Sequence, residues 1–280
     1  MLQETQVLFS ASNLSVSVPG RSLVDNLDLE LKCGELIAIL GQNGAGKSLT
    51  LHTLAGLRPA ESGDIELEGR PISGLLRRAV AQRLALLPQN SEDIFPATVF
   101  DTVLIGRHPH IEPLRWESAE DRQFAETCLR EMDLADLADR EISTLSGGER
   151  RRLAIAQTLA QDPRIFLLDE PTNHLDPQHQ LDVLRLFVER ARLGAGVIAC
   201  LHDVNLAARF ADRCLLLYGA GRWHLGDTHD VLSEDLLTDL YGVKMEALDW
   251  RGLKLFVAAG LSVDEVGNSV YAPRSVQATL

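Results

Sequence analysis

The sequence predicts an α/β fold: a core with a mainly parallel sheet, an N-terminal antiparallel β subdomain and an inserted helical subdomain. Three observations predict it. Residues 35–40 form a near-continuous apolar run that leads into a glycine-rich loop, residues 41–48. Further apolar runs, each ending at a polar residue, recur later in the chain, as in sheets whose strands are buried on both faces. A long segment with helical periodicity separates two of these runs.

The first part of the chain alternates apolar and polar residues. A period of two indicates half-buried strands, and their succession here favours an antiparallel arrangement. The apolar positions are Leu14, Val16 and Val18, then Leu27, Leu29 and Leu31, then Ile65 and Leu67.

The predicted buried strands end at polar side chains. After residues 35–40 they are residues 83–87, 165–168 and 197–201, which are followed by Gln89, by Asp169 and Glu170, and by His202. Ligands of an open parallel sheet lie beyond the carboxyl ends of its strands. We therefore expect these four side chains to face whatever the loop at residues 41–48 binds.

Residues 97–160 are predicted to form the helical insertion. Ser118 and Asp121 have the spacing of a capping box, and Gly147-Gly148 opens a further helix that ends before Pro163. After about Thr228 the signals weaken. We assign residues 8–245 to the main domain and residues 246–280 to a C-terminal extension, whose tail from Arg251 is expected to form small strands or an irregular extension.

The glycine-rich loop fits the phosphate-binding pattern G-x-x-x-x-G-K-[ST] at every fixed position, which predicts a P-loop NTPase core. Its glycines let the backbone wrap around phosphate oxygens. Lys47 can reach the β- and γ-phosphates, and Ser48 can offer its hydroxyl to Mg²⁺. The predicted nucleotide contacts here are Gly41, Asn43, Gly44, Ala45, Gly46, Lys47, Ser48 and Leu49.

The carboxylates after residues 165–168 are predicted to carry the chemistry. Asp169 is placed to hold the metal, and Glu170 to polarise water for attack on the γ-phosphate, a role that contributes about 10²–10⁴ in rate. Gln89 is predicted to touch the metal or the attacking water, and His202 to hydrogen-bond the γ-phosphate. A lone glutamine or histidine is often structural, so the shared topology makes both candidates.

Residues 145–149, Leu-Ser-Gly-Gly-Glu, form a second segment rich in hydroxyl and glycine that opens a helix. Such a segment is a second anion-binding nest. One chain thus carries two devices that can hold phosphate.

Composition narrows the class of protein. A formal net charge of −13 argues against a nucleic-acid backbone as the main partner; solubility alone, or a partner with basic cytoplasmic loops, accounts for it. No apolar run approaches the ~20 residues of a membrane-spanning helix, and the N-terminus lacks the pattern of a signal peptide. The four cysteines are scattered, so we expect buried, reduced thiols in a cytosolic protein.

Taken in order, these motifs resemble those of the nucleotide-binding subunit of an ATP-binding cassette (ABC) transporter. The resemblance covers about residues 10–230 and rests on residues 41–48, Gln89, 145–149, 165–170, Asp176 and His202. Residues 145–149 match the signature motif of that family. The resemblance implies ATP and Mg²⁺ as ligands and a head-to-tail homodimer that buries ATP between its two copies.

Several roles follow from the resemblance alone. Ser146, Gly147 and Gly148 are expected to contact the ATP of the other copy, and Asp176 to lie across the same seam. Val18 stands where the family often has an aromatic residue that stacks on adenine, so we expect base recognition by apolar contact and a weak preference for ATP over GTP.

A finer resemblance concerns the transported cargo. Residues 103–110 and 201–210 are similar to ATPases that import ferric siderophores, haem or cobalamin. This implies a separate membrane permease, an extracytoplasmic substrate-binding protein, and a place at the cytoplasmic face of the plasma membrane. His108 and His110 are expected to be solvent-facing residues near the permease contact rather than metal ligands.

Other readings remain open at this point. A soluble ABC ATPase of DNA repair or translation, an ABC subunit for another cargo, and a nucleotide-binding regulator without activity share the phosphate loop. A P-loop kinase or GTPase does too, but it leaves residues 145–149 unexplained.

Overall fold

A six-stranded sheet forms the centre of the computed structural model, which describes residues 6–89 and 96–259. Its strand order is β10-β9-β3-β8-β7-β6, and every neighbouring pair is parallel except β9 with β10. The predicted mainly parallel sheet is confirmed. Its strands are β3 (Leu36–Gly41), β6 (Leu84–Leu87), β7 (Ile165–Asp169), β8 (Gly196–Cys200), β9 (Arg213–Gly219) and β10 (Arg222–Asp227).

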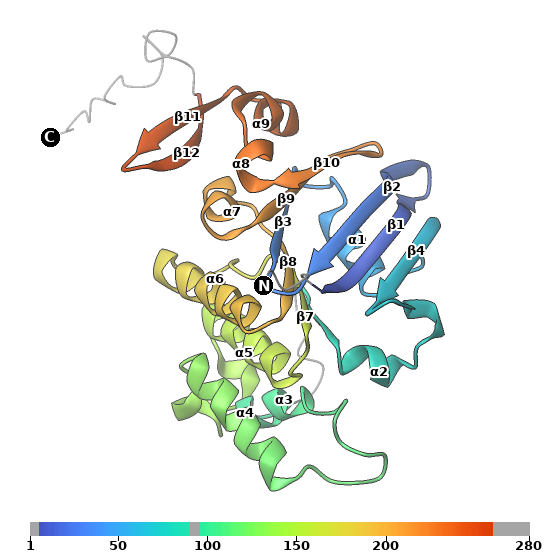
Figure 1. Cartoon of the computed structure of the whole chain (residues 1–280). Coiled ribbons are helices and arrows are strands. Elements are labelled where there is room, and N and C mark those ends of the chain that lie inside the picture. The colour runs from blue at the N-terminus through green and yellow to red at the C-terminus, as the bar shows by residue number, and fades with distance from the viewer. Residues whose placement is uncertain (1–5, 90–95, 260–280) are drawn as a thin grey trace, which may run out of the picture.

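The alternating N-terminal segments form the predicted antiparallel sheet, in the order β2-β1-β4-β5. Its strands are β1 (Val7–Val18), β2 (Arg21–Lys32), β4 (Ser62–Leu67) and β5 (Arg70–Pro71). Helix α1 (Lys47–Leu54) lies between this sheet and the central one, and the 3-10 turn η1 (Ile72–Gly74) and α2 (Arg77–Ala81) lead back to β6 (Figure 1).

Strand β3 is apolar at nearly every position because both of its faces are buried. Leu36, Ala38 and Leu40 belong to one hydrophobic core, whereas Ile37 and Ile39 belong to a second core on the other face of the sheet. Each buried isoleucine side chain contributes about 1.5–3 kcal/mol of transfer free energy. Figure 1 shows α5 and α6 against the first face and α1 with the antiparallel sheet against the second.

Residues 97–160 are largely helical. They contain α3 (Val99–Ile105), α4 (Ala119–Glu131), the 3-10 turns η2 (Ala135–Leu137) and η3 (Ile142–Thr144), and α5 (Gly147–Ala160). Ser118 caps α4 through the predicted capping box with Asp121. Gly106 lets α3 approach α5 closely, because a Cβ atom there would lie 2.3 Å from the carbonyl oxygen of Gln157.

The chain then adds α6 (Pro177–Arg192), α7 (Val204–Phe210), α8 (Thr228–Val231) and α9 (Glu234–Tyr241), and ends its described part in a hairpin of β11 (Met245–Trp250) and β12 (Leu253–Ala258). Small strands were one of the two expectations for the tail from Arg251, where β12 lies. Most of that predicted extension, residues 260–280, lies outside the described residues.

All four cysteines are free, as expected, but Cys33 is half-exposed rather than buried; its Sγ donates to the carbonyl oxygen of Gly194 over 3.1 Å. Within the described residues, no helix has the length and hydropathy of a membrane span.

Candidate functional site

The phosphate loop joins β3 to α1 with a backbone that needs its glycines. Gly44 and Gly46 have φ angles of 80° and 104°, in the left-handed region that favours glycine. A Cβ atom at Gly46 would also press to 3.0 Å from the Cβ of Leu23 in β2. The loop therefore presents the N-terminus of α1, where backbone N–H groups favour an anion.

Lys47 is buried at the start of α1. Its Nζ donates to the carbonyl oxygens of Gly41 and Gln42 over 2.8 and 3.2 Å. The ammonium group is thus held across the loop by two backbone carbonyls that the loop itself supplies. A phosphate bound in the loop would meet a positive charge that is already positioned.

Asp169 ends β7 with only 1% of its surface exposed. Its Oδ1 atom is buried and has no hydrogen-bond partner among the described residues. Burial raises the pKa of Asp169 above its ordinary value, and the neighbouring Ser48 hydroxyl partly offsets this. Mg²⁺ prefers oxygen ligands, and this buried carboxylate oxygen without a hydrogen-bond partner, beside a serine hydroxyl, could be one of them.

Glu170 is the centre of a cluster of side chains. Its Oε1 lies 2.6 Å from Nε2 of His202, and its Oε2 accepts a hydrogen bond from Nε2 of Gln89 over 2.7 Å. Asn173 Nδ2 donates to the same Oε2. The carboxylate is therefore oriented from three sides.

Sheet register explains this convergence. β6, β7 and β8 are parallel neighbours, with Leu87 opposite Leu168 and Asp169 opposite Cys200. The residues that follow these strands consequently emerge at one edge of the sheet. The structure brings Gln89, Glu170 and His202 together. The side chain of Gln89 donates its hydrogen bond to Glu170, the predicted base, rather than to Asp169, the predicted metal ligand.

The segment at residues 145–149 begins α5. Ser146 is its N-cap: its Oγ accepts from the Glu149 N–H over 3.3 Å, and its own N–H donates to Glu149 Oε2 over 2.7 Å. A Cβ on Gly147 would meet nothing within 4 Å, whereas one on Gly148 would lie 3.5 Å from the carbonyl oxygen of His174. Within the single chain, then, Ser146 has a structural role in capping the helix.

Asp176 caps α6 in a similar way. Its Oδ1 accepts from the His179 N–H over 3.0 Å, and its Oδ2 lies 2.9 Å from the Nδ1 of the same histidine. Its side chain remains 60% exposed. The 3.5 Å between a Cβ placed on Gly148 and the carbonyl oxygen of His174 shows that the start of α5 lies beside the segment that leads to Asp176.

Comparison with known proteins places this site in a family. The family model described as ABC transporter matches residues 24–173, from within β2 to Asn173, and so includes Gln89 and Glu170 but not His202. The chain belongs to the ABC transporter family. It is an ATP-binding subunit and an ATPase, with the mixed α/β fold of its relatives.

Individual relatives extend the match over most of the chain. This ABC ATPase is 41% identical to a hemin import ATP-binding protein of Streptomyces coelicolor, over 86% of this chain and 85% of the relative. It is 37% identical to a siderophore transport system ATP-binding protein of Bacillus subtilis, over 85% and 86% of the two chains. A solved metal-chelate type ABC transporter in an inward-facing conformation superposes with a TM-score of 0.79 at 30% identity, covering 91% of this chain and 98% of that one.

Val18 is the last residue of β1 in the ABC ATPase, paired with Arg21 and half-buried. The carbonyl oxygen of the preceding Ser17 accepts a hydrogen bond from Arg58. An apolar side chain thus stands at the position predicted to meet the base, on a backbone held by an arginine.

Two residues that contact Glu170 were not predicted from the sequence, Asn173 and Arg151. Asn173 follows Glu170 by three residues, a spacing typical of a turn, and Glu170 itself has a φ of 52°. Arg151, on the first turns of α5, is buried and donates to the carbonyl oxygen of Glu170 over 2.8 Å. In the sequence it is one of three consecutive arginines, residues 150–152, and no local pattern distinguishes it from the other two.

His110 differs from its expected solvent-facing place. It is half-buried, and its Nε2 lies 2.8 Å from the carbonyl oxygen of Gln161 at the end of α5. His108 is exposed. Within the described residues, no cluster of three or more histidine, cysteine or acidic side chains could hold a metal ion.

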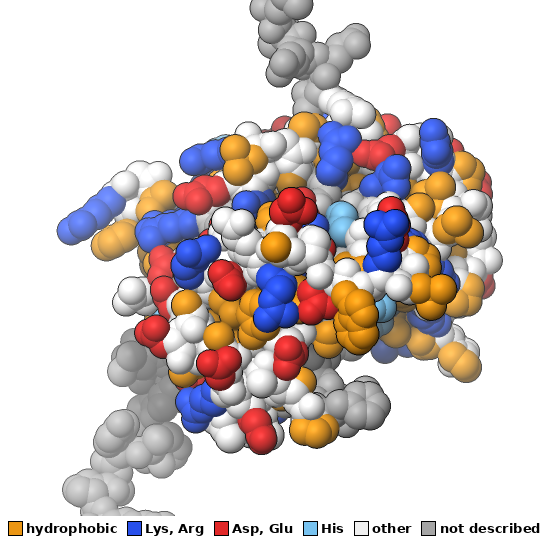
Figure 2. Space-filling model, turned by 90° about the horizontal axis from the view of Figure 1, so that it is seen from below, with side chains coloured by type: hydrophobic (Ala, Val, Ile, Leu, Met, Phe, Trp, Pro, Cys, Tyr) orange, Lys and Arg blue, Asp and Glu red, His pale blue; other side chains and the backbone are white. Residues whose placement is uncertain are grey.

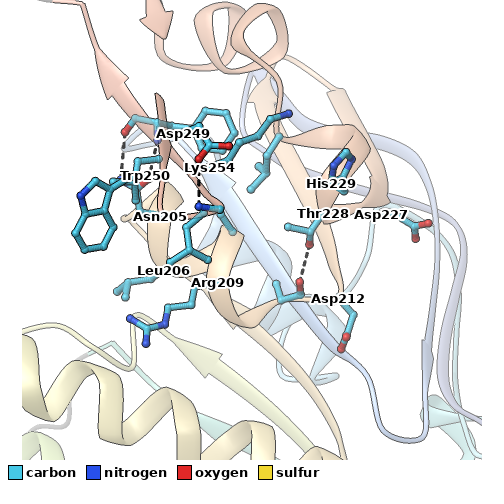
Figure 3. A pocket seen from close by; sticks show the side chains of 17 residues that line it. Asn205, Leu206, Arg209, Asp212, Asp227, Thr228, His229, Asp249, Trp250 and Lys254 are labelled. Atoms are coloured by element: carbon cyan, nitrogen blue, oxygen red, sulfur yellow. Dashed lines mark hydrogen bonds between the residues drawn. The ribbon is translucent and has the colours of Figure 1, made fainter. Parts of the chain in front are cut away.

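A cavity of about 700 Å³ lies apart from these residues, between α7 and the hairpin β11–β12. Figure 3 shows Asn205 reaching across to the hairpin, where it accepts from the Phe256 N–H over 2.7 Å and donates to the Phe256 carbonyl oxygen over 3.1 Å. None of the predicted site residues lines this cavity.

Proposed function

We propose that this ABC ATPase energises the import of an iron chelate, haem first and a ferric siderophore second, through a separate membrane permease. The observation that supports it is the likeness to a hemin import and a siderophore transport ATP-binding protein over more than four fifths of both chains. The likeness to a solved metal-chelate type transporter points the same way. Cobalamin stays in the test below because it is a metal chelate as well.

In the proposed reaction, the phosphate loop and Lys47 hold the phosphates of ATP. Ser48, Asp169 and Gln89 are the residues that would hold Mg²⁺, which supplies charge neutralisation at the phosphates. Glu170 polarises the water that attacks the γ-phosphate. His202, against one oxygen of Glu170, and Gln89, against the other, orient that carboxylate and stand beside the attacked phosphate.

The proposed catalytic unit is a homodimer. Ser146, Gly147 and Gly148 at the start of α5, with Asp176 at the start of α6, would contact the ATP held by the partner's phosphate loop. The open space beside Gly147 and the exposed Asp176 carboxylate suit a contact from outside the chain. Each ATP is then enclosed only when two copies meet.

The segment from Gln89 to about Arg115 is proposed to pass this closure to the permease at the cytoplasmic face of the membrane. Its first residue contacts Glu170. The segment exposes Ile105 at the end of α3 and Leu114 further on, and Trp116 just after the segment is exposed as well. Figure 2, viewed from the side where Figure 1 places the loop between α3 and α4, shows hydrophobic side chains among charges of both signs. Such a mixed surface suits a protein partner better than nucleic acid.

The test is ATP hydrolysis by the ATPase assembled with its permease in lipid vesicles, with the substrate-binding protein added. Haem, a ferric siderophore and cobalamin are supplied in turn on the outer side. We expect haem to stimulate hydrolysis and to enter the vesicles. Stimulation by cobalamin alone, or by none of the three, would refute the proposed cargo while leaving the ATPase itself unaffected.

A further inference from the structure

Arg151 makes an unusual set of contacts for a buried charge. Its Nη1 donates to the carbonyl oxygens of Pro88 and Gln89 over 2.7 and 3.2 Å, and its Nη2 to those of Asp169 and Glu170 over 2.5 and 2.8 Å. Its Nε approaches a fifth carbonyl, that of Pro171, at 3.4 Å. One guanidinium thus joins the segments that follow β6 and β7.

These contacts are with backbone only. Burial lowers the pKa of Arg151 to about 10, with Asp169 and Glu170 acting in the opposite sense, so the side chain stays protonated at neutral pH. Burying a charge without an ion-pair contact costs several kcal/mol unless its hydrogen bonds are all made. The planar fork of arginine can satisfy four or five carbonyls at once, which a lysine cannot.

Three of the five carbonyls that Arg151 approaches belong to residues with a proposed role in hydrolysis, Gln89, Asp169 and Glu170. Gln89 and Glu170 meet through their side chains over 2.7 Å, and Arg151 fixes the peptide groups from which both side chains start. Arg151 itself belongs to α5, whose N-cap is Ser146 five residues earlier. Arg151 therefore links α5 to both strand ends.

We propose that Arg151 is a positioning residue: it sets the separation and orientation of Gln89 and Glu170 and ties that geometry to the helix that carries Ser146. The inference rests on the proposed role of Glu170 in hydrolysis. Arg151 does not touch the reacting atoms, so its effect is on the rate of the chemical step and not on the affinity for ATP.

The experiment compares Arg151→Met and Arg151→Lys in the full chain by ATPase kinetics, with thermal unfolding and binding of a fluorescent ATP analogue measured on the same samples. A displacement of about 1 Å costs on the order of 10²-fold in rate. We expect Arg151→Met to lower kcat by about 10- to 100-fold with KM within about threefold of wild type, and Arg151→Lys to fall between. A wild-type kcat in a folded Arg151→Lys or Arg151→Met protein overturns the proposal.

Arg213→Met is the matched control for loss of a partly buried arginine. Arg213 donates to the carbonyl oxygen of Glu30 and to Glu35 over 3.0 and 3.1 Å, at the start of β9 and so at the opposite end of the sheet from Glu170. We expect it to lower thermal stability without lowering kcat. If the two variants lose stability equally and also lose kcat equally, the role of Arg151 is structural and the proposal is wrong.

A double variant separates this inference from the proposed function. If Arg151 acts through Glu170, adding Arg151→Met to Glu170→Gln lowers single-turnover hydrolysis by less than about threefold more. A further full loss in the double variant overturns the positioning role. Undiminished hydrolysis in Glu170→Gln alone refutes the base role of Glu170, a result that is read independently of Arg151.

Discussion

The Nε2 atom of His202 lies 2.6 Å from Oε1 of Glu170, although the two residues follow different strands and are 32 positions apart in the chain. Glu170 is nearly buried, whereas the histidine side chain is 42% exposed. The exposed histidine therefore stands between a buried carboxylate and solvent. This geometry supports the proposed role of Glu170 in hydrolysis.

Glu170→Gln is expected to lower hydrolysis by about 10²–10⁴-fold, because the amide cannot accept a proton from water. The amide still reaches His202 and Gln89, so the fold and ATP binding should be retained. Phosphate release measures the rate, and a fluorescent ATP analogue measures the affinity. Turnover within about twofold of wild type would remove Glu170 from the base role.

Ser146→Arg tests the shared site. The bulky charge at the start of α5 should block ATP-dependent dimerisation, seen by light scattering, and abolish hydrolysis while ATP still binds the phosphate loop. The substitution also removes an N-cap worth about 1 kcal/mol.

Ser118→Arg controls for that loss, because Ser118 caps α4 through the same kind of box, with Asp121. We expect Ser118→Arg to lose similar stability and to dimerise and hydrolyse ATP normally. A Ser146→Arg protein that hydrolyses ATP as a monomer would disprove the shared site.

Asp169→Asn is expected to stabilise the nucleotide-free chain while removing Mg²⁺-dependent hydrolysis. Burial holds the pKa of Asp169 above its ordinary value of 3.8, so the folded state binds its proton more tightly than the unfolded chain. The stability it contributes is present below pH 3.8 and is lost as pH rises through the raised pKa. In urea unfolding from about pH 4 to 7.5, the free energy of unfolding of the variant should increase relative to that of wild type as pH rises.

Asp176→Asn should show the opposite pH dependence of stability relative to wild type. Hydrogen bonds from the His179 backbone and side chain lower the pKa of Asp176, so its contribution is present above the ordinary value of 3.8 and is lost as pH falls. The deficit of this variant against wild type should therefore shrink toward acid pH. The same trend in both variants would contradict the assigned environment of Asp169.

Val18→Tyr is expected to tighten ATP binding. Stacking of a base on an aromatic ring is worth about 1–3 kcal/mol, so the Kd should fall by about fivefold or more. Val7→Tyr, at the other end of β1 and exposed, is the control that should leave the Kd unchanged. Titrations with ATP and GTP compare the two bases. An unchanged Kd in Val18→Tyr would place the base elsewhere.

Local patterns were sufficient for the elements whose periodicity is strong. The two-sided burial of β3 and the alternation of β1, β2 and β4 could be predicted because each reflects a repeated environment along the strand. The turn that opens α4 could be predicted as well, since its cap lies within four residues. The hairpin β11–β12 was left open between strands and irregular structure, because one of its partners is the side chain of Asn205, some fifty residues earlier.

By itself the sequence determined the phosphate loop and the strand ends that carry Gln89, Glu170 and His202. It also determined that the segment at residues 145–149 opens a helix. Spacing along the chain dictates these features. Only the tertiary structure decided that Gln89, Asn173 and His202 converge on Glu170, that Asp169 keeps a buried oxygen without a partner, and that Arg151 bridges two strand ends from α5. Those contacts join residues up to about eighty positions apart. Parallel register and burial between layers bring them together, and neither is visible in a local pattern.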